Sequence, residues 1–100
     1  MTPLESTIAR NILRALNATP GCRAVKSHGS IYGRRGEPDI RGVLNGRAFF
    51  LEVKRPGLQP TPIQACEFRS WAATGAIVAV VHTVEDALLA LGLTPARRIR

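Results

Sequence analysis

Apolar residues recur every three or four positions near the start of the chain, at Leu4, Ile8, Ile12, Ala15 and Leu16. This spacing predicts an amphipathic helix. Thr2 suits the N-cap, Pro3 suits the first helical position, and Glu5 lies three residues after Thr2, as in a capping box. Pro20-Gly21 closes the segment.

Four later runs have the composition of strands, at residues 23–26, 39–44, 47–54 and 76–81. Asn45-Gly46 separates the second run from the third, and this dipeptide between two apolar runs predicts a hairpin with a two-residue type I′ turn. The run at 76–81 is short, β-branched and continuously apolar, which predicts a buried strand.

Two further helices open with recognisable caps. Thr61-Pro62-Ile63-Gln64 repeats the pattern of threonine, proline and a residue that completes a capping box, so a helix is expected to about Ala73, before Gly75. Thr83 caps a last helix that runs through Leu91, and Gly92 ends it.

The predicted order is therefore α-β-β-β-α-β-α. The strand–helix–strand unit across residues 47–81 implies a right-handed parallel crossover, whereas the hairpin is antiparallel. The fold class is α/β, with a small mixed sheet flanked by helices. We expect one domain over residues 1–94, followed by an arginine-rich tail, 95–100, that frays.

Composition and charge narrow the function. The chain has 100 residues, of which 45% are apolar, enough for one modest core. The net charge of +7 favours a polyanionic partner, with nucleic acid first and an anionic membrane second. No apolar run approaches the roughly 20 residues of a membrane helix, and no signal peptide is recognised. The two cysteines, Cys22 and Cys66, are expected as reduced thiols, which favours a cytoplasmic location.

The hairpin brings two acidic residues together. In a two-residue turn at 45 and 46, the numbers of each opposed pair sum to 91, so Asp39 lies across from Glu52. Opposed Cβ atoms are about 4.5–5.5 Å apart, and two like charges there are destabilising unless a cation neutralises them. Magnesium prefers such oxygen ligands. A bulge at Gly42 would shift this pairing by one residue.

Lys54 is expected on the same face as these carboxylates, because residues two apart in a strand project alike. A lysine beside a metal-binding pair can activate water or stabilise charge on a phosphate. The alternative is a solvent-facing edge with one salt bridge, which is the commoner meaning of an isolated Glu-x-Lys. Asp39 at the opposed position favours the functional interpretation.

Glu5 and Gln64 each have two interpretations. Each fits a capping box, which is a structural role. Each also lies on the inward face of its helix, Glu5 with Ile8 and Gln64 with Phe68. An inward acid requires a partner, which favours a site role for Glu5, and the two roles of Gln64 remain balanced. Two histidines are interpreted as structural or loop residues, His28 and His82.

The segment from His28 to Gly36 is rich in glycine and positive charge, which is typical of a loop. Tyr32 in this loop can stack on a base while neighbouring cations bind phosphates. The expected nucleic-acid-binding residues are Lys26, Tyr32, Arg34 and Arg35. The alternative is a solvated loop.

Together these residues resemble the VRR-NUC domain, a branch of the PD-(D/E)xK nuclease superfamily with a restriction-endonuclease-like core. The resemblance runs from Leu4 to Leu91 and rests on Glu5, Gly36-Glu37-Pro38-Asp39, Glu52-Val53-Lys54 and Gln64.

The resemblance implies a metal-dependent phosphodiesterase acting on DNA. Asp39 and Glu52 would bind Mg²⁺ or Mn²⁺ with the backbone carbonyl of Val53, Lys54 would assist the attacking water, and Glu5 and Gln64 would complete the site. Minimal members resemble stand-alone, phage-type enzymes that act as homodimers and are similar to Holliday-junction resolvases, so branched DNA and a homodimer are expected.

Two other functions remain open at this point. The first is a non-catalytic, basic DNA-binding module with the same fold, although the presence of Asp39, Glu52 and Lys54 together favours catalysis. The second is an RNA-directed nuclease, for which the sequence offers no recognition motif.

Overall fold

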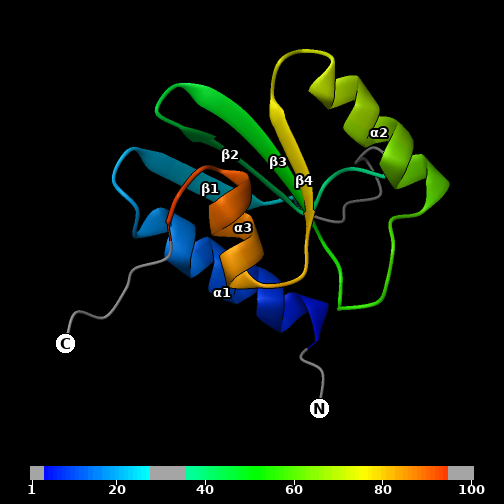
Figure 1. Cartoon of the computed structure of the whole chain (residues 1–100), viewed down its shortest axis with the longest axis horizontal. Coiled ribbons are helices and arrows are strands. Elements are labelled where there is room, and N and C mark those ends of the chain that lie inside the picture. The colour runs from blue at the N-terminus through cyan, green and yellow to red at the C-terminus, as the bar shows by residue number, and fades with distance from the viewer. Residues whose placement is uncertain (1–3, 28–35, 95–100) are drawn as a thin grey trace.

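The computed structural model describes residues 4–27 and 36–94, and these residues form a four-stranded sheet with three helices (Figure 1). The strand order is β1-β2-β3-β4. The elements are α1 (Glu5–Asn17), β1 (Cys22–Lys26), β2 (Ile40–Leu44), β3 (Arg47–Val53), α2 (Pro62–Ala72), β4 (Ile77–Val81) and α3 (Val84–Ala90). The predicted element order, α-β-β-β-α-β-α, is confirmed. The proposed tail, 95–100, lies outside the described residues.

The helices lie on both faces of the sheet. Figure 1 shows α1 and α3 together below the sheet, whereas α2 lies apart from them beside β4. The face of the sheet that α1 and α3 cover carries the hydrophobic core, in which the aliphatic side of α1 packs against alternate residues of the strands. The buried members of this core are Ile8, Ala9, Ile12, Leu16, Ala24, Ile40, Phe49, Leu51, Val53, Val81, Ala87 and Leu91.

The hairpin between β2 and β3 has the predicted register. Leu44 pairs with Arg47, and the ladder continues without interruption to Ile40 opposite Leu51. The turn residues Asn45 and Gly46 both have positive φ angles, 49° and 86°, as a type I′ turn requires. The predicted hairpin is therefore confirmed.

Gly42 is not a bulge, although the sequence made it a plausible bulge position. It sits in an unbroken ladder between Ala24 and Phe49. A Cβ atom there would lie 2.5 Å from Cζ of Phe49 and would collide with the carbonyl oxygen of Arg23. Glycine is needed here because the Phe49 ring occupies the space that a side chain would fill. The reason for this glycine is therefore side-chain packing, and no bulge is involved.

The first helix begins later than predicted, at Glu5, and the predicted capping box involves Thr2, which lies outside the described residues. Leu4 is the N-cap and makes no side-chain cap hydrogen bond, while Thr2 and Pro3 lie outside the described residues. Leu4 is also 65% exposed, so it does not belong to the apolar stripe. The carboxylate of Glu5 instead accepts a hydrogen bond from the distant backbone N–H of Arg55.

The strand–helix–strand unit gives the expected parallel pairing of β3 with β4. β4 was predicted to be buried, but it is an edge strand of which only Val81 is fully buried. Its continuous apolar run reflects partial cover on both faces, from α3 and α2. On the opposite edge, the side-chain amide of Asn17 bonds both the N–H and the C=O of Ala24 at 2.9 Å, which satisfies outward-facing backbone groups of β1.

The two later helix starts agree with prediction. Thr61 caps α2 in a complete capping box with Gln64, and the Thr83 hydroxyl accepts from the N–H of Asp86 at the start of α3. Among the described helices, none has the length and apolar character needed to cross a bilayer.

Candidate active site

Asp39 and Glu52 meet where the hairpin register predicted. Asp39 directly precedes β2, and Glu52 lies one residue beyond Leu51, the partner of Ile40. The carboxylate of Asp39 accepts a hydrogen bond of 2.8 Å from the N–H of Val53. The strand backbone thus holds Asp39 at the end of the sheet, beside the buried Glu52 carboxylate.

Glu52 is the most unusual residue of the site because its carboxylate is only 2% exposed. Its Oε2 atom accepts a hydrogen bond of 2.9 Å from Nε2 of Gln64 and lies 3.7 Å from Nζ of Lys54. Its Oε1 atom is buried and lacks a hydrogen-bond partner among the described residues. Buried carboxylate oxygens without a partner are costly and are often explained by a missing ion or water.

The surroundings of Glu52 raise the pKa of its carboxyl to about 8, from an ordinary value of 4.5. Burial is the largest cause, because removal from water disfavours the charged form, and the neighbouring Asp39 carboxylate adds to it. Lys54 acts in the opposite direction. Without a cation, these surroundings favour the protonated form of the Glu52 carboxyl.

Gln64 makes the predicted capping-box contact and also contacts Glu52 of the candidate site. Its side-chain oxygen accepts from the N–H of Thr61 at 2.9 Å and completes the capping box, while its Nε2 group donates to Glu52. Because an amide carries an acceptor and a donor on opposite atoms, one side chain serves both. The start of α2 is thereby tied to the buried carboxylate of β3.

Glu5 and Lys26 also belong to this region. They line a polar hollow of about 170 Å³ together with Asp39 and Val53. Glu5 is half-buried, and its carboxylate accepts a hydrogen bond of 3.1 Å from the N–H of Arg55, which supplies a partner for the acid. Lys26, predicted to contact nucleic acid, lies beside the carboxylates instead of apart from them.

His82, which the sequence analysis interpreted as structural, contacts the end of β3 next to the site. His82 Nδ1 lies 2.9 Å from the carbonyl oxygen of Lys54, and its backbone N–H donates to Asp86. The N–H of Lys54 in turn donates to Val81. These contacts hold the end of β3. The only sequence signal for them is that His82 directly follows β4, the strand that pairs with β3.

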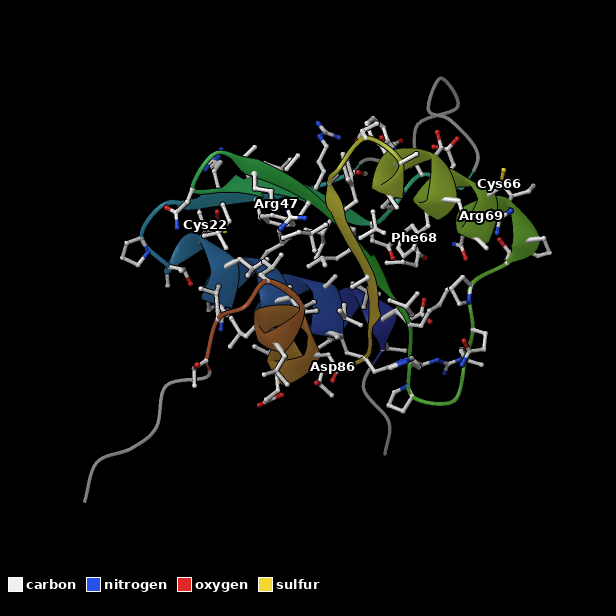
Figure 2. The ribbon with its side chains drawn as sticks, turned by 45° about the horizontal axis from the view of Figure 1, so that its top comes forward. Cys22, Arg47, Cys66, Phe68, Arg69 and Asp86 are labelled. Carbon is white, nitrogen blue, oxygen red and sulfur yellow. The ribbon has the colours of Figure 1, made fainter. Side chains whose placement is uncertain are left out.

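Some predicted residues are not placed by the structure. Tyr32, Arg34, Arg35 and His28 lie outside the described residues. Cys66 is exposed on the outward side of α2, whereas Phe68 lies on the side that faces the sheet (Figure 2).

The donor atoms of the site fit a hard divalent cation. Residues 4–27 and 36–94 contain no group of three or more His, Cys, Asp or Glu side chains arranged to hold a metal. A metal at this position would therefore depend on the Asp39 and Glu52 pair, with backbone carbonyl or water oxygens completing its coordination. Such mixed oxygen sets are usual for Mg²⁺, and the unpartnered Oε1 of Glu52 is an available donor.

Comparison with solved structures identifies the fold. One VRR_NUC domain superposes with a TM-score of 0.72 and 27% sequence identity, covering 88% of this chain and 94% of that one. A second VRR_NUC domain protein superposes with a TM-score of 0.74 at 15% identity, covering 92% of this chain and 88% of that one. The resemblance to VRR-NUC domains predicted from the sequence is confirmed.

Sequence comparison adds a phage relative. "Putative nuclease p44" of Acyrthosiphon pisum secondary endosymbiont phage 1 is 42% identical over 52 residues, which are 51% of this chain. The match spans 56% of that protein, so this chain aligns with only about half of its length. No family model matches the chain.

The raised pKa of Glu52 predicts how stability depends on pH in the absence of metal. Between pH 4.5 and about 8 the folded protein keeps a proton that the unfolded chain releases. This contribution to stability is fully present below pH 4.5 and is lost as pH rises through about 8. In urea denaturation with EDTA, the free energy of unfolding should therefore fall from pH 6 to pH 9 by ~1 kcal/mol or more.

Glu52→Gln is the matched control because it remains neutral throughout this range. Its free energy of unfolding should vary less with pH, and at pH 9 it should exceed that of the wild type. Equal pH dependence in the two proteins would show that Glu52 does not carry the shift.

Proposed function

We propose that this VRR-NUC-type protein is a nuclease that hydrolyses phosphodiester bonds of DNA with Mg²⁺ or Mn²⁺. The observation that carries the proposal is the buried Glu52 carboxylate beside Asp39, with Lys54 at its side and with one oxygen that has no hydrogen-bond partner in residues 4–27 and 36–94. Two carboxylates so close are unfavourable for a purely structural role. The description of the phage relative as a nuclease supports the same class of activity.

Asp39 and Glu52 would hold the cation, and the backbone carbonyl of Val53 would join them. When bound, the cation lowers the pKa of a water molecule and withdraws charge from a phosphate oxygen. It would also replace the proton that Glu52 otherwise holds. The hydrogen bond from Val53 N–H orients the Asp39 carboxylate from the strand backbone.

The remaining residues position the reacting groups. Lys54 is only 14% exposed, so its ammonium group is held near Glu52, where it can assist the attacking water and stabilise charge on the phosphate. Gln64 orients the Glu52 carboxylate. Glu5, from across the hollow beside Asp39, completes the set of polar groups around the water.

Binding of DNA is proposed to depend mainly on phosphate contacts. Lys26 lies at the rim of the hollow, and the net charge of +7 adds a general attraction for a polyanion. Tyr32, Arg34 and Arg35 are proposed to extend this contact. Branched DNA is the preferred substrate in this proposal, and a homodimer would offer two symmetric sites to two scissile strands.

Cleavage assays test the proposal directly. With Mg²⁺ or Mn²⁺, the wild type is expected to cut labelled four-way junction, flap or duplex DNA, and Asp39→Ala is expected to lose this activity because half of the anionic ligand pair is gone. The substrate cut fastest identifies the structural preference. Binding to all three DNAs without cutting by the wild type would favour a non-catalytic DNA-binding module.

Lys54→Ala separates binding from chemistry. We expect its Kd for DNA to change less than threefold, because Lys54 is one largely buried cation among many, while the cleavage rate falls on the order of 100-fold or more. Lys26→Ala, at the exposed rim of the same hollow, is the matched control and should weaken binding more than it slows cleavage of bound DNA. Equal loss of binding and cleavage in Lys54→Ala would overturn its assigned role.

A pair of variants distinguishes the two roles of Gln64. Thr61→Ala removes only the helix cap and should lower the free energy of unfolding by about 1 kcal/mol without changing cleavage by the folded protein. Gln64→Ala also releases Glu52 and should reduce cleavage about 10–100-fold, as expected for a residue that orients a metal ligand. Both are measured by urea denaturation and by single-turnover cleavage. If the two variants lose activity equally, the Glu52 contact has no functional effect.

A further inference from the structure

The second face of the sheet carries an open groove beside α2, separate from the hollow that holds Asp39 and Glu5. Its volume is about 310 Å³. Its floor is formed by apolar residues and its rim by two arginines, and the seven lining residues are Arg23, Val25, Arg41, Gly42, Val43, Ala48 and Phe50. No helix among the described residues covers it, and Val43 is 45% exposed. A groove of this size is within the range of ligand sites.

The groove lies next to the candidate active site. Arg41 and Val43 alternate along β2 and share a face, as do Phe50 and Glu52 of β3, and Asp39 directly precedes β2. Arg41 is two residues from Asp39, which is roughly 7 Å along a strand. The groove therefore lies next to the carboxylate pair along β2 and β3.

The chemistry of the groove suits a nucleotide. Phe50 lines the floor and stacks on Trp71 of α2, with ring centroids 4.3 Å apart and an angle of 24° between the rings. An apolar floor that contains an aromatic ring accepts the face of a base, and arginines at the rim accept its phosphates. Arg23 is exposed, while Arg41 lies 3.9 Å from Glu37, a weak and exposed pair that a phosphate can replace.

An unpaired nucleotide fits this groove better than a duplex or a second copy of the chain. A duplex presents phosphates and sugars outward, so the apolar floor would have no base to contact. A two-fold contact centred on the groove would bring Arg23 and Arg41 of both copies into one interface, and no acidic residue is among the described residues that line the groove to offset their charge.

We propose that this groove binds unpaired nucleotides of a DNA strand next to the scissile phosphate, so that the substrate class includes a single-stranded arm or a splayed junction. This inference rests on the proposed nuclease function. Bases stack over Phe50, and Arg23 and Arg41 hold the phosphates on either side.

Binding in EDTA tests the groove without cleavage. Fluorescence anisotropy compares a forked duplex carrying an unpaired thymidine arm with a blunt duplex of the same sequence. Val43→Glu places a negative charge in the groove and should weaken binding to the forked DNA at least tenfold, with less than a twofold change for the blunt duplex. Leu89→Glu is the matched control, because Leu89 is 65% exposed on α3 and receives the same charge. It should change both affinities less than twofold.

Two further measurements complete the test. The chain has one tryptophan, Trp71, so its emission should change when the forked DNA, but not the blunt duplex, is added. If Val43→Glu does not fold, Arg23→Ala is compared with Arg10→Ala, which removes an exposed arginine from α1. The same selective loss is expected for Arg23→Ala only.

The outcomes separate this inference from the proposed function. Equal effects of Val43→Glu and Leu89→Glu on the affinity for forked DNA would overturn the inference. It would also be overturned if the wild type sediments as a dimer and Val43→Glu as a monomer, with no selective loss of affinity for forked DNA. If Val43→Glu cuts forked DNA with metal as fast as the wild type, the role of the groove is overturned and the nuclease function stands. Selective binding by a wild type that cuts no DNA would support the groove and overturn the nuclease function.

Discussion

The register of the β2–β3 hairpin brings together the two carboxylates on which the candidate site depends. A two-residue turn at Asn45-Gly46 permits only one pairing of the two strands, and a slip of one residue would move each side chain to the opposite face. Because the ladder runs without a bulge from this turn to Ile40, the carboxyl groups of Asp39 and Glu52 meet at its far end. The separation of the turn from the site, five pairs away, requires regular pairing throughout.

The same register requires the fold to accommodate an unfavourable residue. Glu52 is buried among groups that raise its pKa, and a buried charge is destabilising unless it is paired and hydrogen-bonded. Gln64 and Lys54 supply part of this compensation at Oε2, and they leave Oε1 unpartnered. Apolar packing would be cheaper at this position. The retention of a partly satisfied carboxylate is therefore better explained by chemistry than by stability.

Much of this arrangement could be predicted because local signals and the register are sufficient for it. The order of elements, the hairpin and the caps of α2 and α3 follow from spacing and turn chemistry. The start of α1 could not be predicted correctly, because Glu5 bonds to the N–H of Arg55, fifty positions away, and a capping pattern reports only local geometry. The role of Gly42 was ambiguous because it depends on a residue of the neighbouring strand. Only the position of the Phe49 ring explains it.

The proximity of Asp39, Glu52 and Lys54 could be predicted from the sequence, whereas the contacts that connect them to other elements could not. Opposed numbering brought Asp39 to Glu52, and alternation brought Lys54 to the same face. The contact of His82 with the Lys54 carbonyl depends on the parallel pairing of β3 with β4, whose register no local pattern specifies.

One side chain joins stability to chemistry in this fold. Gln64 begins α2 through its oxygen and holds Glu52 through its nitrogen, and α2 also contributes Trp71, which stacks on Phe50 two residues before Glu52. The helix is therefore fixed to β3 at two points on the same face of the sheet. A shift of α2 along the strand would break the polar contact at the site and the aromatic contact at the groove together. The position of α2 thus couples the buried carboxylate to the adjacent open face, which explains how a short helix with no fully buried residue still has a defined place on the sheet.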